Sequence, residues 1–275
     1  MDKEFISDLQ IGGLVIIQKE NGFRFGTDAV LLSDFAKDVR ADRIVDLCTG
    51  TGIVPILLYA KTGASHIMGI EIQEEIADMA KRSVKLNDIG HRVSIECGDL
   101  RRLSLTPHSY DMVTVNPPYM KCGNAITNDL DTKTISRHEV MCTLEDVISC
   151  SAKLLKNKGH LVMVHRPSRL ADVISAMRRY NIEPKRLRMV HPQAHKAPSL
   201  FLIDGALCGG EELKVLPPLI MQDEFGNESP ELKDIYERDN ALERFVADGE
   251  GTIINHSKPH INWEETIKRK KRTIK

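Results

Sequence analysis

From residue 43 onward, short apolar runs alternate with stretches of helical apolar spacing, and this alternation constrains the fold more than any other feature. Two such runs with a helix between them form a βαβ unit, because parallel neighbours need a long crossover connection. The sheet should therefore be mostly parallel, with helices on both faces. The predicted strands span 43–47, 68–72, 93–99, 111–116 and 159–165, and the predicted helices span 54–62, 74–87, 143–157 and 168–180.

The last two extended runs, 185–191 and 199–206, have no helix between them. They should pair as an antiparallel hairpin at one edge of the sheet, joined by the P-Q-A-H-K-A-P loop. Together with the five strands before them, they predict an α/β fold. Its Rossmann-like sheet has seven strands, mostly parallel, and one of them is reversed.

The first 40 residues follow a different pattern. Residues 13–26 look like a β-hairpin that turns at Asn21-Gly22, and Thr27 is placed to cap a helix over 28–36. We therefore divide the chain into three parts. These are an N-terminal hairpin and helix packed on the main domain (1–40), the main α/β domain (41–239) and a C-terminal extension to which the pattern assigns no order (240–275).

Composition and charge narrow the class of protein. The chain has 275 residues and a formal net charge of −1, so any basic surface for nucleic acid must be local. No apolar stretch is long enough for a membrane span and the first residues lack a signal-peptide core, so we expect a cytoplasmic protein. The six cysteines form no C-x-x-C pair, which argues against a zinc or redox motif, and we expect no metal. Because no secretion signal is seen, we expect the thiols to be reduced. The oligomeric state is not defined by the sequence, although we favour a monomer.

A glycine-rich turn, D-L-C-T-G-T-G (46–52), follows the first strand of the α/β region and opens its first helix. Gly50 and Gly52 let the backbone approach a ligand, and Glu71 ends the next strand, where such folds hold ribose hydroxyls. A dinucleotide-binding G-x-G-x-x-G motif is incomplete, because Pro55 replaces its third glycine. Asp46 is placed to meet an ammonium group or to order the turn. These features favour S-adenosylmethionine over a dinucleotide.

Asp99 closes the third strand and can accept a hydrogen bond from the adenine amino group, with Leu100 beside the ring. Asp46, Glu71 and Asp99 thus follow three successive strands, at the edge where open α/β sheets bind ligands. The alternative is that each acid only caps a strand-to-loop junction.

The run V-T-V-N-P-P-Y-M (113–120) ends a strand abruptly, because two successive prolines cannot continue a hydrogen-bonded ladder. Two acceptors, the Asn116 side-chain oxygen and the Pro117 carbonyl, would hold a planar amino group with its lone pair aimed at a methyl donor. Tyr119 would stack on the ring of the target. The alternative is a plain turn after a strand, since Asn-Pro commonly begins one.

These motifs resemble those of class I S-adenosylmethionine-dependent methyltransferases, in which N-P-P-Y marks enzymes that methylate amino groups. Further stretches narrow the resemblance to the bacterial tRNA1(Val) adenine-N6-methyltransferase family, which modifies the adenosine beside the anticodon. The stretches are N-G-F-R-F-G-T-D-A-V-L-L (21–32), D-L-C-T-G-T-G-I, N-P-P-Y, S-R-H-E (136–139) and H-K-A-P-S-L-F-L (195–202). The resemblance runs from about residue 8 to about 238, and it makes 41–239 the methyltransferase domain.

The resemblance implies a role for each site residue. Asn116, Pro117 and Tyr119 are expected to be catalytic, since they hold the target base. Thr27 is expected to contact the methionine carboxylate of the cofactor. The full set of expected cofactor-binding residues is Thr27, Asp46, Gly50, Gly52, Glu71, Asp99, Leu100 and Asn116.

A long polar segment, 120–139, follows Tyr119, and long loops beside a site tend to be functional. The implied partner is tRNA, and basic residues in this segment would contact its phosphates. They are Lys121, Lys133, Arg137 and His138. The alternative is a solvated loop.

Other activities remain open at this stage. N-P-P-Y also suits protein glutamine-amide methylation and guanine-N2 methylation of ribosomal RNA, because both targets are planar amino groups. The first group carries a separate helical N-terminal domain, for which 40 residues leave no room, and the second often duplicates the fold. A catalytically silent RNA-binding protein is a further alternative, against which the intact Asn116 argues.

Overall fold

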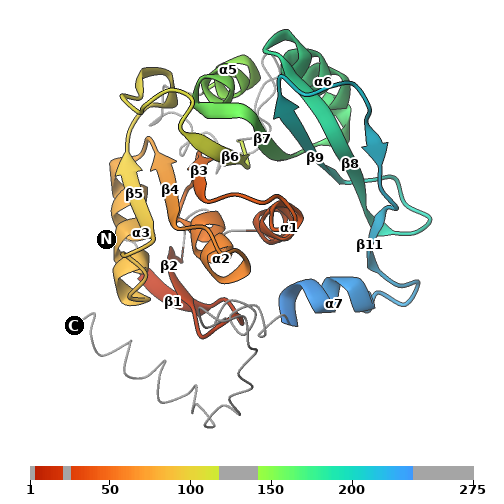
Figure 1. Ribbon diagram of the computed structural model, residues 1–275. Helices are drawn as coiled ribbons and strands as arrows, with labels where there is room; N and C mark the ends of the chain where they lie inside the picture. The colour runs from red at the N-terminus through yellow and green to blue at the C-terminus, as the bar shows by residue number, and fades with distance from the viewer. Residues whose placement is uncertain (1–3, 21–25, 118–141, 238–275) are drawn as a thin grey trace, which may run out of the picture.

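The computed structural model describes residues 4–20, 26–117 and 142–237. In this part of the chain a large mixed sheet is flanked by helices, and a separate two-stranded sheet lies at the N-terminus (Figure 1). The strands are β1 (Glu4–Asp8), β2 (Val15–Lys19), β3 (Arg43–Leu47), β4 (His66–Glu71), β5 (Val93–Cys97), β6 (Tyr110–Val115), β7 (Leu155–His165), β8 (Ile182–Gln193), β9 (Leu200–Leu207), β10 (Lys214–Val215) and β11 (Leu219–Gln222). The helices are α1 (Thr27–Ala36), α2 (Ile53–Lys61), α3 (Glu74–Leu86), α5 (Leu144–Leu154), α6 (Leu170–Arg179) and α7 (Pro230–Glu237), with short 3₁₀ turns at Leu100–Arg102 and Pro167–Arg169.

The large sheet has the strand order β10-β8-β9-β7-β6-β3-β4-β5, with β11 also paired to β8. Strands β5, β4, β3, β6 and β7 are parallel, whereas β9 runs antiparallel to both β7 and β8. This confirms the Rossmann-like α/β fold with an antiparallel hairpin. The sheet is wider than the predicted seven strands, because β10 and β11 pair in parallel with the outer side of β8.

The strands bury both faces, as expected for parallel strands covered by helices. Successive residues alternate between two core clusters: Ile44 packs with α1, α2 and α3, and Val45 packs with α5 and α6. Met112 and Val113 in β6 divide in the same way. In Figure 1, α5 and α6 lie on one side of the sheet and α1 and α2 on the other. The helices therefore hold the ends of the strands in fixed positions.

Two local predictions about helix ends had different outcomes. Thr143 and Asp146 form a complete capping box at the start of α5, as their spacing indicates. Thr27, by contrast, does not cap α1: it is the first helical residue, and Gly26 is the N-cap, in an extended conformation. The predicted helix over 143–157 is also too long, because the chain turns into β7 at Leu155.

The N-terminal hairpin differs from its prediction. β2 pairs with β1, so the observed turn lies between Asp8 and Val15, while the predicted turn at Asn21-Gly22 lies outside the described residues. The hairpin is fixed to α3 through Asn87, whose side chain accepts from Val15 N (2.9 Å) and donates to Val15 O (2.7 Å). Ser83 adds a bond from Ile17 N (3.0 Å). The division of the chain at residues 40 and 239 stays a prediction.

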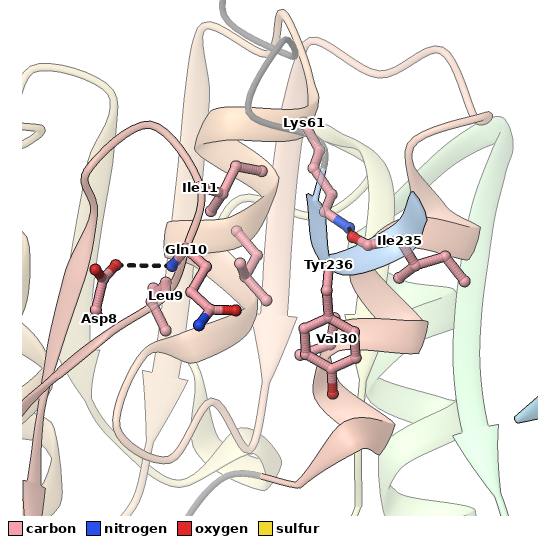
Figure 2. Close-up of a pocket in the computed structure, with 9 residues that line it drawn as sticks. Asp8, Leu9, Gln10, Ile11, Val30, Lys61, Ile235 and Tyr236 are labelled. Carbon is pink, nitrogen blue, oxygen red and sulfur yellow. Dashed lines mark hydrogen bonds between the residues drawn. The ribbon is translucent and has the colours of Figure 1, made fainter. Parts of the chain in front are cut away.

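Helix α7 returns to pack against α1, near the end of the described chain (Figure 1). Its Ile235 carbonyl lies 3.4 Å from Nζ of Lys61, a buried lysine that also pairs with Asp34 at 3.1 Å. Burial opposes the charge on Asp34, yet Lys61 and Lys37 keep the pKa of its carboxyl below the ordinary value. Figure 2 shows Lys61, Ile235 and Tyr236 beside residues of the N-terminal hairpin, around a cavity of about 60 Å³. This cavity lies at the C-terminal end of α2, away from the glycine turn at the other end of that helix.

We predict that Asn87→Ala lowers the free energy of unfolding by about 1–3 kcal/mol, because the variant leaves two backbone groups of Val15 without these bonds. Urea unfolding measures the change. Lys85→Ala, an exposed change on the same helix, is the control and should alter stability by less than ~0.5 kcal/mol. Equal effects of the two substitutions would show that Asn87 does not anchor the hairpin.

Candidate methyltransferase active site

The site is built where parallel strands end side by side. Asp46 of β3 lies opposite Gly69 of β4 and Thr114 of β6, so the carboxyl ends of these strands share one edge of the sheet. Glu71 is the last residue of β4, and Asn116 directly follows β6. The register therefore brings Asp46, Glu71 and Asn116 to the edge at which open α/β sheets bind ligands.

The glycine turn between β3 and α2 is held by Glu71. One carboxylate oxygen accepts from Gly50 N at 2.9 Å and the other from Gln73 N at 3.0 Å. Gly50 and Gly52 have φ values of +57° and +85°, in the left-handed region that favours glycine. A Cβ placed on Gly50 would meet no atom within 4 Å, so the backbone there faces open space.

Asp46 is buried below this turn, with 1% of its surface exposed. Its Oδ1 accepts a hydrogen bond of 2.7 Å from the hydroxyl of Thr114 on the neighbouring strand. Burial raises the pKa of Asp46 to about 7, although the bond from Thr114 favours the charged form. A cation placed near Asp46 would stabilise its carboxylate, which suits the ammonium group of an amino acid.

β5 ends at Cys97, two residues before the predicted end, and Asp99 precedes the 3₁₀ turn that Leu100 begins. The two oxygens of Asp99 contact the guanidinium of Arg101 at 2.6–3.1 Å, and this contact lowers the pKa of Asp99. An adenine amino group bound to Asp99 would therefore share the carboxylate with Arg101. Leu100 is buried in the apolar cluster on the α5 side of the sheet, and its expected contact with the adenine stays a prediction.

Asn116 and Pro117 mark the end of β6. The Asn116 side chain donates from Nδ2 to Oδ2 of Asp28, in the first turn of α1, at 3.0 Å. Pro117 is buried. The remaining predicted substrate-binding residues lie outside the described residues, and their roles stay predictions; they are Tyr119, Lys121, Lys133, Arg137 and His138.

Thr27 stands one residue before Asp28. Its Oγ1 accepts a hydrogen bond of 3.3 Å from the hydroxyl of Tyr236 on α7. Burial raises the pKa of that tyrosine. Thr27 is therefore bonded to α7, and its neighbour Asp28 is bonded to Asn116. Contact of Thr27 with the cofactor stays a prediction.

Several residues of this region were missed by the sequence patterns. Gly69 is one: a Cβ there would lie 2.8 Å from Oγ1 of Thr49 and 2.8 Å from Cδ1 of Ile95. This glycine therefore allows Thr49, in the glycine turn, to pack closely on β4. Its position in the middle of a strand was the available signal, because such glycines often mark a close approach.

His165 was also missed. It ends β7, beside β6, and is 5% exposed. Burial lowers its pKa to about 4, so the imidazole is neutral near pH 7. Its Nδ1 accepts from Arg166 N at 2.8 Å, which places the ring proton on Nε2.

Comparison with known proteins identifies this arrangement. Residues 44–127 match the model of the methyltransferase domain family. The chain is 30% identical over 182 residues to the tRNA1(Val) (adenine(37)-N6)-methyltransferase of Bacteroides thetaiotaomicron, covering 66% of this chain and 75% of that protein. The chain belongs to this methyltransferase family. The Porphyromonas gingivalis (strain W83) protein of the same name is 29% identical over 187 residues, with 65% and 72% coverage.

A solved structure agrees with the fold. A protein described as a predicted O-methyltransferase from Agrobacterium tumefaciens superposes with a TM-score of 0.62 and 23% identity, over 78% of this chain and 96% of that one. At this identity the likeness concerns the fold alone. No helix within the described ranges is long and apolar enough to cross a lipid bilayer.

The chain is therefore an S-adenosylmethionine-dependent methyltransferase, which confirms the activity and the cofactor expected from the sequence. The structure fits this cofactor, because open space adjoins Gly50 in the turn and a buried carboxylate, Asp46, lies beneath it. Which side chains contact the cofactor stays a prediction.

We predict that Asp46→Asn stabilises the ligand-free protein more at pH 8 than at pH 5. The folded-state pKa of about 7 lies above the ordinary value near 4, so the wild type loses stability as the pH rises from about 4 to about 7. The amide of the variant does not titrate. The difference in unfolding free energy between variant and wild type should therefore grow by roughly 2–3 kcal/mol from pH 5 to pH 8, since one pKa unit corresponds to ~1.4 kcal/mol. Urea unfolding at both pH values measures it. A difference independent of pH would show that Asp46 does not titrate in this range.

Proposed function

We propose that this protein methylates the N6 amino group of an adenine in tRNA, and that its target is the adenosine beside the anticodon of tRNA1(Val). The observation that carries the proposal is Asn116 at the end of β6, in register with the turn that follows β3. The activity named for the relatives from Bacteroides and Porphyromonas supports the choice of an adenine in tRNA.

The cofactor would lie along the ends of β3, β4 and β5, and when bound it supplies an electrophilic methyl group on a sulfonium. Asp46 and the turn at Gly50 and Gly52 would hold its amino-acid part, with Thr27 on the carboxylate. Glu71 would bind the ribose: its two oxygens already accept backbone bonds, but each has a second lone pair. Asp99 and Leu100 would hold the adenine.

Asn116 and Pro117 would hold the target amino group. The nitrogen of adenine N6 is a poor nucleophile, because its lone pair is delocalised into the ring. The amino group would donate two hydrogen bonds, one to the side-chain oxygen of Asn116 and one to the carbonyl oxygen of Pro117. These bonds would fix the nitrogen and direct its lone pair toward the methyl group. Positioning of this kind lowers a barrier by several kcal/mol without a covalent intermediate.

The same pair of acceptors would select the substrate. A ligand without amino hydrogens leaves both oxygens unpaired in a desolvated site, which is costly. Tyr119 would stack on a base swung out of its neighbours, as in other enzymes that modify bases. Basic residues in the segment after Tyr119 would bind RNA phosphates; they are Lys121, Lys133, Arg137 and His138. The protein would thus act on tRNA despite its near-zero net charge.

We predict that Asn116→Ala lowers kcat for methyl transfer by at least ~100-fold, because it removes one of the two acceptors that position the amino group. The dissociation constant for S-adenosylmethionine should change by less than ~3-fold, because the cofactor is held mainly by the turn and the strand-end acids. Radiolabel transfer and calorimetric titration measure the two quantities.

The matched control is Asn157→Ala, an exposed asparagine near the start of β7, at the opposite edge of the sheet. It should keep wild-type kcat and cofactor affinity. If Asn116→Ala methylates at the wild-type rate, the clamp mechanism is wrong.

The target is tested with bulk tRNA, ribosomal RNA and total protein, each prepared from a strain that lacks this protein. We expect label from tritiated S-adenosylmethionine in N6-methyladenosine of one tRNA species after nucleoside analysis. Label in N2-methylguanosine, or in protein glutamine, would refute methylation of a tRNA adenine and support one of the other amino-group activities. No transfer to any of these would support a catalytically silent protein.

A further inference from the structure

Asp28 contacts Asn116 across 88 positions of sequence. Its Oδ2 accepts the 3.0 Å bond from Asn116 Nδ2, and its Oδ1 accepts a 2.9 Å bond from the backbone N of Ala29. The sequence placed Asp28 only in the first turn of a helix. The fold adds a contact with the side chain that the proposed chemistry depends on.

This contact gives the Asn116 amide a direction. A carboxylate only accepts hydrogen bonds, so the amide must turn its NH2 group toward Asp28. The carbonyl oxygen of Asn116 occupies the other branch of the planar group and therefore points away from Asp28. A rotated amide would instead bring its oxygen against a carboxylate oxygen, and the two acceptors would repel each other.

Asp28 is itself rigidly placed. The residues that follow it, Val30, Leu31 and Leu32, are buried, and α1 packs against β6, β7 and β9. Gly26 leaves room for the carboxylate, because a Cβ at that position would lie 2.8 Å from Oδ1 of Asp28. The start of α1 thus presents a fixed acceptor to the end of β6.

We propose that Asp28 is a positioning residue for methyl transfer. It fixes the Asn116 amide so that the carbonyl oxygen, and not the NH2 group, is presented to the target amino group. An amide in the opposite orientation would present N–H groups to the N–H groups of the substrate and could not hold it. This inference rests on the proposed function, because it assigns Asn116 the role of acceptor.

The first test is Asp28→Asn. The new amide has the same size and keeps an oxygen for the Ala29 N–H, but it can also donate, so it no longer selects one orientation of Asn116. We expect kcat to fall at least ~10-fold, while KM for tRNA, cofactor affinity and the thermal unfolding midpoint stay near wild type. Asp38→Asn, the same chemical change at an exposed residue just beyond α1, should leave kcat unchanged.

The second test is rescue. Asn116→Asp alone sets two carboxylates against each other and should be less active than Asp28→Asn. In the double variant D28N/N116D the new amide at position 28 donates to the new carboxylate at position 116, whose other oxygen still accepts from the substrate. We expect the double variant to be at least ~10-fold more active than N116D, a coupling that independent structural defects would not produce.

Wild-type kcat in Asp28→Asn would overturn the inference, and so would a double variant no more active than N116D. Nucleoside and protein analysis of the wild-type reaction comes first, and the variants are then ranked on whichever amino group the wild type methylates. Methylation of glutamine or guanine would refute the proposed target. The relative activities of the variants on that substrate would then still test the role of Asp28. A wild-type protein that methylates no amino group would overturn both.

Discussion

The carboxylate of Glu71 fixes the geometry on which the rest of the site depends. By accepting from Gly50 N and Gln73 N, it joins the glycine turn after β3 to the segment after β4. Asp46 adds the next link through Thr114, so β4, β3 and β6 are connected at one edge of the sheet by buried acids. Asn116, two residues after Thr114, consequently has a fixed position relative to the glycine turn. Asp28 then fixes the direction of its amide.

The sheet and the turn were predictable from the sequence because both leave local signals. Apolar runs separated by helical spacing give strand–helix alternation, and the left-handed conformations at Gly50 and Gly52 require the residues that the sequence contains there. The capping box of Thr143 and Asp146 was predictable for the same reason, since the two partners are three residues apart.

Long-range contacts left no comparable signal. β1 pairs with β2, and β10 and β11 extend the sheet beyond β8. The sequence did not predict these pairings, because β1, β10 and β11 are short segments without a distinctive pattern. In the site, the contacts of Asp28 with Asn116 and of Tyr236 with Thr27 join residues far apart in sequence. Local patterns therefore define the elements, whereas polar contacts between residues far apart in sequence define how the ends of these elements meet.

In the proposed mechanism, the side-chain oxygen of Asn116 and the carbonyl oxygen of Pro117 hold the target amino group. The most direct measurement is a crystal structure of the protein with a tRNA anticodon stem-loop and sinefungin, a cofactor analogue that cannot transfer a methyl group. We predict adenine N6 about 3 Å from both Oδ1 of Asn116 and the carbonyl oxygen of Pro117, with Nδ2 of Asn116 still on Asp28. An ordered target base whose N6 lies beyond hydrogen-bonding distance of both oxygens would show that Asn116 and Pro117 do not hold the amino group.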